Sequence, residues 1–149
     1  MKRLRRVLAL PPAERRLLLT VALLLGVIRL GLRLLPFRTL CRLLNRAARV
    51  SVGLEAVDAF RPDRIAWAVT VASPYMLGVR RCLVQALVVQ LLLVRRGYPA
   101  RVHLGVARGD GGQVQAHAWV EAGGRIVIGG SVSELERYTP LLALDAHTT

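Results

Sequence analysis

Cysteine, aromatic residues and acidic charge are all scarce in this 149-residue chain. Its two cysteines, Cys41 and Cys82, stand in unlike surroundings and lack CxxC or Cys/His spacing, which argues against a disulfide framework and a structural zinc site. Two Phe, two Trp and three Tyr accompany the basic charge, and no zinc-finger, RNP-like or lysine-rich pattern is present. Nucleic-acid binding is therefore not expected, and neither is a metal or another cofactor.

The charge is strongly one-sided. Nine acidic residues face 22 basic ones, for a formal net charge of +13, and Lys2 is the single lysine. This excess favours a negatively charged partner or surface. The preference for arginine over lysine also fits a GC-rich coding background, so the charge alone identifies no partner.

Long hydrophobic runs are missing as well, although 54% of the residues are apolar. In the N-terminal region the longest uncharged run, residues 17–28, has 12 residues, fewer than the roughly 20 that cross a bilayer. Pro11 and Pro12 interrupt the basic start before it. We expect no cleavable signal and no membrane-spanning helix, and hence a cytoplasmic protein or one peripheral at the inner face of the membrane.

The first third of the chain has the pattern of an amphipathic helical region over residues 13–50, with a break at Pro36. Arginines one turn apart form two basic stripes beside leucine-rich surface: Arg29 with Arg33, and Arg38 with Arg42 and Arg46. The stripes fit a solvated face, a docking site for a partner protein or an anionic membrane surface. We expect residues 1–60 to form this basic helical region and residues 61–149 to form the core domain.

Helices and then strands are predicted for the core domain. A helix over residues 65–72 is followed by a turn, and a second helix runs from Arg81 to a C-cap at Gly97. Alternating residues 102–106 and 113–122 predict two strands, and a two-residue hairpin at Gly123 and Gly124 leads into a third over residues 125–128. The expected fold class is α+β, with a helix packed on an antiparallel β-meander.

One cysteine and one histidine are placed for nucleophilic catalysis. Cys82 falls in the first turn of its helix, where free N–H groups, the helix dipole and the adjacent Arg80 and Arg81 favour a thiolate. His117 lies mid-strand, where the pleat fixes its direction, as a general base requires. His103 lies near a strand end and is the weaker candidate. Cys41, inside an apolar helix, is expected to be a buried structural thiol.

The stretches "CLVQALVVQLLLVRRGYPARVHLGV", "AHAWVE" and "RYTPL" together resemble the transglutaminase-like leader peptidases of lasso-peptide biosynthesis. The similarity covers about residues 65–142. It implies a papain-like thiol protease core that removes the leader peptide from a ribosomally made precursor. It also implies a separate leader-recognition protein and an ATP-dependent macrolactam synthetase as partners.

The chain departs from the family pattern at the third catalytic position, where the family carries an aspartate on the returning strand. With Gly123 and Gly124 at the hairpin tip, Gly130 is expected opposite His117 and Gly129 opposite Ala118, so no carboxylate occupies the place. The group that orients the imidazole through Nδ1–H is then Ser131, Glu134 or a backbone carbonyl.

Three further expectations concern the site. The backbone N–H of Cys82 is the natural donor to the oxyanion. Trp119, on the same strand face as His117, either walls the substrate cleft or packs as an ordinary strand residue. Glu121 is expected to form a surface ion pair.

Two other functions fit the same residues. An acyl-transferring, transglutaminase-like enzyme uses the same thiol for the same first half-reaction. A non-catalytic membrane or protein adaptor fits the basic N-terminal region and the missing acid. The sequence identifies neither the scissile bond and the precursor nor the oligomeric state.

Overall fold

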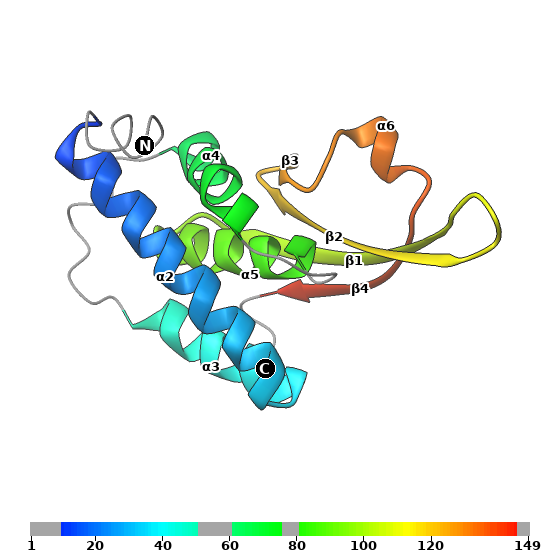
Figure 1. Cartoon of the computed structure of the whole chain (residues 1–149), viewed down its shortest axis with the longest axis horizontal. Coiled ribbons are helices and arrows are strands. Elements are labelled where there is room, and N and C mark those ends of the chain that lie inside the picture. The colour runs from blue at the N-terminus through cyan, green and yellow to red at the C-terminus, as the bar shows by residue number, and fades with distance from the viewer. Residues whose placement is uncertain (1–9, 51–60, 76–80, 146–149) are drawn as a thin grey trace.

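The computed structural model describes residues 10–50, 61–75 and 81–145, which form a helical layer and a four-stranded antiparallel sheet (Figure 1). The elements are, in chain order, α2 (Pro12–Leu34), α3 (Phe37–Arg49), α4 (Pro62–Ala72), the 3-10 turn η2 (Ser73–Tyr75), α5 (Arg81–Val94), β1 (Ala100–Arg108), β2 (Val114–Ala122), β3 (Arg125–Ile128), α6 (Val132–Leu135) and β4 (Thr139–Asp145). This arrangement confirms the expected α+β class.

Prolines set the limits of the first helices. Pro12 is the first residue of α2, and Pro36 ends that helical run and caps α3. Proline suits these positions because it lacks the N–H that the first helical turn leaves unpaired. Pro62 opens α4 in the same way, so this helix begins three residues before the expected start at residue 65.

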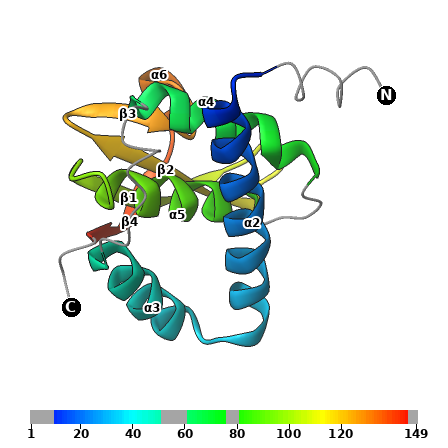
Figure 2. The same cartoon turned by 90° about the vertical axis from the view of Figure 1, so that its left-hand side faces the viewer.

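The helix α2 belongs to the same hydrophobic core as α4 and α5. One of its faces buries Leu17, Val21, Leu25 and Ile28, and these cluster with Ile65 of α4 and with α5. The view in Figure 2 shows α2 on the side of the helical layer away from the sheet. The expected domain boundary at residue 60 lies outside the described residues and stays a prediction.

By length and hydropathy, α2 also qualifies as a membrane span, with a mean hydropathy of 2.1 over 18 residues. The sequence argument missed this because it considered only the uncharged run, whereas the longer window tolerates flanking arginines. Core helices of soluble proteins pass the same test. One face of α2 packs in the core, but only 28% of the window is buried, and it lies near the N-terminus, where a signal sequence passes the same test. The expected absence of a membrane-spanning helix stays a prediction.

The sheet has the order β3-β2-β1-β4. Strands β1, β2 and β3 form the expected meander, whereas β4 returns to pair with β1 at the opposite edge. Neither β4 nor α6 was expected, because most of β4 is exposed and its residues show no alternating burial. The meander prediction is therefore corrected by a fourth strand.

The hairpin register differs from the expected one by a bulge. At its tip the pairs Glu121–Ile126 and Ala122–Arg125 are as predicted, but the register shifts at the next position, where Val120 pairs with Ile128. One extra residue on β3 causes this shift. Gly129 therefore lies against Trp119 instead of opposite Ala118, and its carbonyl oxygen contacts the His117 side chain.

Candidate active site

Cys82 is the second residue of α5 and is half-buried. Backbone N–H groups of a first helical turn have no acceptor within their own helix, so they concentrate positive potential at this end. The structure thus confirms that Cys82 lies in the first turn of a helix. Its roles as nucleophile and as backbone donor to the oxyanion stay predictions.

A polar contact within the core holds α5 against the sheet. The side chain of Gln90 is 7% exposed, and its Nε2 donates to the carbonyls of Ala100 in β1 (3.2 Å) and Leu144 in β4 (2.6 Å). Eight residues of helix separate Gln90 from Cys82, a rise of about 12 Å. Cys82 itself is partly buried and packs against the hydrophobic core.

Gly105 pairs with His117 of β2. The absence of a side chain at Gly105 leaves room for Trp119, since a Cβ there would lie 2.9 Å from the indole ring. Trp119 fills this space and is 7% exposed. Its ring stacks between those of His103 (5.5 Å) and His117 (6.4 Å), so it is a packed strand residue. Its role in a substrate cleft stays a prediction.

His117 is held by a backbone carbonyl. Its Nε2 lies 2.5 Å from the carbonyl oxygen of Gly129. A carbonyl oxygen accepts only, so Nε2 carries the proton. The neutral imidazole then has its lone pair on Nδ1. We had expected Nδ1–H to be the orienting group, and the structure uses the other ring nitrogen.

Tyr138 completes the surroundings of the imidazole. Its ring stacks on that of His117 with centroids 5.1 Å apart. Tyr138 was not among the predicted site residues, because this residue follows a short helix and a turn that no periodic pattern in the sequence predicts. The "RYTPL" stretch of the resemblance contains this residue and was the available signal.

A glycine turn places the Gly129 carbonyl. Gly129 and Gly130 have φ values of +111° and +122°, which favour glycine. A Cβ on Gly129 would lie 2.4 Å from the Cβ of Trp119. Gly129, which stands in the region where the family pattern carries the acid, is therefore a glycine because its backbone comes close to β2.

Glu134 stabilises this turn without bonding to the histidine. Its Oε2 accepts from the backbone N–H of Ser131 (2.7 Å) and from the Ser131 hydroxyl (2.8 Å), forming a capping box at the start of α6. These bonds, the backbone one first, lower the pKa of Glu134, and the nearby Arg137 and His117 contribute to the same shift. Of the three expected orienting groups, the described structure supplies the backbone carbonyl.

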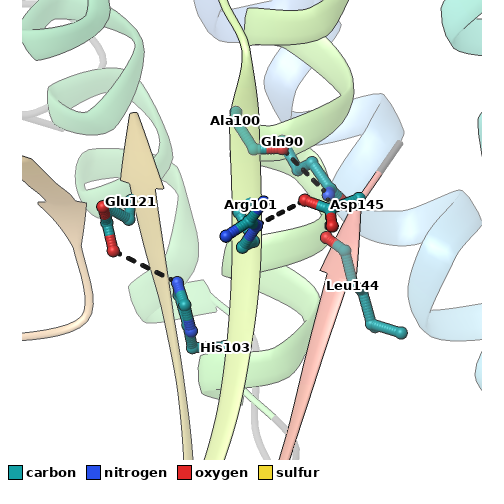
Figure 3. A network of polar contacts seen from close by, with 7 residues as sticks. All are labelled: Gln90, Ala100, Arg101, His103, Glu121, Leu144 and Asp145. Carbon is teal, nitrogen blue, oxygen red and sulfur yellow. Dashed lines mark hydrogen bonds and ion pairs between the residues drawn. The ribbon is translucent and has the colours of Figure 1, made fainter. Parts of the chain in front are cut away.

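The sheet has two distinct faces. Ala118 and Val120 of β2 lie in the core with α5, so the alternating residues His117 and Trp119 project from the other face. Figure 3 shows that face, with α5 behind β1. Among the described residues there is no hydrogen bond between Cys82 and His117. Their catalytic pairing stays a prediction.

His117 nonetheless lies at a strand edge. Strand β3 ends at Ile128, opposite Val120, so the part of β2 that includes His117 pairs with no strand on that side in the described chain. At such an edge no neighbouring strand separates the two faces of the sheet.

His103 has a different environment. Its Nε2 lies 3.3 Å from Oε2 of Glu121 on β2, at ion-pair distance but without hydrogen-bond geometry. Glu121 thus faces His103 (Figure 3), a contact that is an ion pair only where the imidazole is protonated, so the expected surface ion pair stays a prediction. Arg101 pairs with Asp145 beside it, at 2.5 Å. These contacts join β1 to both of its neighbours.

Two further residues of the helices, Gln85 and Cys41, have local contacts of their own. Gln85 donates to the Ser73 hydroxyl at 2.6 Å, which ties α5 to the end of α4. Cys41 is half-buried, so the expectation of full burial was too strong, and desolvation raises the pKa of its thiol. No group of three His, Cys, Asp or Glu suitable for a metal ion occurs in the described part of the chain.

The Transglutaminase-like superfamily model matches residues 22–143, most of the chain. The chain therefore belongs to this superfamily, whose members commonly have cysteine protease or acyltransferase activity. No curated protein and no solved structure matches the chain significantly. The match begins within α2 and ends within β4, so it includes both the helical layer and the sheet.

Proposed function

We propose that this protein is a cysteine peptidase that removes the leader peptide from a ribosomally synthesised lasso-peptide precursor. The observation that carries the catalytic part is the Nε2–H bond of His117 to the Gly129 carbonyl. It fixes the imidazole in the tautomer that leaves Nδ1 free to take a proton. Cys82, at the start of α5, is the proposed nucleophile.

The proposed reaction has two half-reactions. The Cys82 sulfur attacks the scissile carbonyl carbon, and the tetrahedral oxyanion is stabilised by the backbone N–H of Cys82. His117 takes the thiol proton and delivers it to the leaving amine as the C–N bond breaks. Water, deprotonated by the same imidazole, then hydrolyses the thioester and restores the thiol.

Catalysis on this scheme requires Cys82 and His117 to meet. The free edge of β2 is the proposed meeting place, because His117 borders no described strand there. The alkylation rate of Cys82 as a function of pH tests this pairing. If the imidazole accepts the thiol proton, His117→Ala moves the onset of alkylation to higher pH, whereas an unchanged profile excludes the pair.

The substrate assignment depends on the motif resemblance. The "CLVQAL" and "HAWVE" stretches and the later "RYTPL" support leader cleavage. A separate leader-recognition protein and a macrolactam synthetase are the proposed partners, the first binding the leader and the second closing the freed core peptide.

Acyl transfer is the second candidate function, because other members of the superfamily transfer the acyl group to an amine. A non-catalytic adaptor is favoured by one observation, that no carboxylate bonds to His117 in the described structure. All three functions predict different products.

Mass spectrometry of a lasso precursor incubated with the protein, its leader-recognition protein and an added primary amine distinguishes them. Peptidase activity yields a leader with a free carboxyl terminus and a core with a free amine. Acyl transfer yields a product that has gained the added amine. An unaltered precursor would overturn both enzymatic proposals.

A further inference from the structure

The outward face of α2 is an uninterrupted apolar row. Leu19, Leu23, Val27, Leu30 and Leu34 follow one another at spacings of three or four residues and are 55–72% exposed. The row covers about 22 Å of helix. An exposed apolar surface of this kind marks an interaction site more often than a solvated one.

This row, which we name the α2 ridge, is one side of a helix whose other side is committed to the core. Leu17, Val21, Leu25 and Ile28 on that other side are at most 2% exposed. Since α2 is the outer helix in Figure 2, the ridge points away from the sheet. The helix can therefore offer one face to a partner while the fold stays intact.

Arginines surround the ridge. Arg16 lies before its first leucine and Arg33 beside its last, and both are exposed. The neighbouring helix α3 adds four exposed arginines: Arg38, Arg42, Arg46 and Arg49. Residues 10–50 contain eight arginines and one acid, so they carry +7 of the chain's formal +13. That single acid, Glu14, pairs with Arg64.

We propose that the α2 ridge and the arginines of α3 dock the protein on an anionic lipid bilayer, with α2 lying in the interface plane. An apolar face that enters the acyl boundary, flanked by guanidinium groups that reach phosphates, is the arrangement expected of an interfacial helix. A second copy of this chain is a poorer occupant, because ridge-to-ridge packing brings two +7 segments together. The inference is independent of the proposed peptidase activity.

Vesicle co-sedimentation of the full chain tests the proposal. The protein is expected to pellet with phosphatidylglycerol–phosphatidylcholine vesicles and to stay in solution with phosphatidylcholine alone. High salt weakens the arginine contribution and lowers the bound fraction. The triple variant Leu23→Gln, Val27→Gln, Leu30→Gln is expected to reduce partitioning at least about tenfold, while glutamine preserves helix formation.

Matched variants separate the ridge from general hydrophobicity. Val114 and Leu141, exposed on the sheet by 72% and 66%, are changed to glutamine in a control that should keep vesicle binding. Circular dichroism of each variant establishes that it is folded. Arg38→Gln with Arg42→Gln and Arg46→Gln keeps the ridge, and is expected to flatten the salt dependence.

Several outcomes would overturn the proposal. Failure of the wild type to pellet with anionic vesicles is one, and unchanged pelleting of the folded ridge variant is another. Binding that resists alkaline carbonate and high salt would show α2 inserted across the bilayer instead. A dimer in light scattering that the ridge variant abolishes would assign the ridge to a second copy of this chain.

Discussion

The imidazole of His117 donates from Nε2 to the carbonyl of Gly129, across the gap where β3 stops pairing with β2. A backbone acceptor takes the role that an aspartate has in the family pattern, and it is one of the three groups that the sequence left open. It fixes the ring direction but adds no negative charge to stabilise an imidazolium. The proposed catalysis is therefore expected to rely on orientation more than on charge at this position.

His117→Ala is expected to lower cleavage on the order of ten-thousandfold, because nucleophile and base act as one unit. His103→Ala, which removes the contact with Glu121 on the same face, is expected to keep most of the activity. Rates of precursor cleavage for the two variants check this. A larger loss in the His103 variant would assign the base to the other histidine.

Gly129→Ala is expected to destabilise the fold by about 1–3 kcal/mol or more, because its φ of +111° is strained for alanine and its Cβ would overlap Trp119. Gly26→Ala is the matched control. Gly26 is in α2 with nothing within 4 Å of an added Cβ, so the change should stabilise by about 0.5–1 kcal/mol. Denaturant unfolding measures both. Equal stability of the Gly129 variant would contradict the tight turn.

Glu134→Gln is expected to loosen the turn that carries the Gly129 carbonyl, because a neutral amide is a weaker acceptor for Ser131. Faster amide exchange at Ser131 and slower precursor cleavage are the expected results. Glu136→Gln, an exposed change at the end of the same short helix, is the control. Loss of activity with unchanged exchange would indicate a direct role of the Glu134 carboxylate.

The lowered pKa of Glu134 also predicts that the turn it stabilises loosens at acid pH. Its folded-state pKa is lowered by the Ser131 backbone N–H, so its contribution is present above the unfolded-state pKa of a glutamate and is lost as pH falls through the lowered value. The protection factor of the Ser131 amide, which removes the intrinsic pH dependence of exchange, should therefore fall only in acid. A fall in that protection factor near neutral pH would contradict this assignment.

Iodoacetamide is expected to label Cys82 faster than Cys41 at neutral pH. Burial raises the pKa of the Cys41 thiol and so lowers its thiolate fraction. Cys82 lies in the first turn of α5, where the helix dipole favours a negatively charged group. Peptide mapping of partially labelled protein gives the two rates, and the reverse order would remove the argument for an activated Cys82.

Much of the fold followed from local pattern. The 3.6-residue periodicity and the prolines predicted the helices, and the alternation on either side of Gly123 and Gly124 predicted the hairpin. The strand β4 was not predicted, because its side chains are mostly exposed and its pairing with β1 is set by contacts distant in sequence. The bulge before Ile128 likewise depends on tertiary packing, so the hairpin tip alone gave the wrong partner for His117.

The site was predictable only in part. The helical position of Cys82 and the strand position of His117 were evident from the sequence, as was the option of a backbone carbonyl. Two features depended on how the chain returns after β3. They are the ring nitrogen that bonds to the carbonyl and the stacking of Tyr138 on His117. Pattern also gave no indication that His117 and α5 belong to opposite faces of the sheet.

The most direct measurement of the central claim is precursor cleavage by two single cysteine variants, followed by mass spectrometry. Cys82→Ser is expected to leave the precursor intact, because a serine hydroxyl is far less acidic than a thiol and the imidazole does not convert it into an effective nucleophile. Cys41→Ser should cleave the precursor at nearly the wild-type rate. Both variants are first shown to be folded by circular dichroism. Full cleavage by Cys82→Ser would contradict the thiol mechanism and the peptidase assignment built on it.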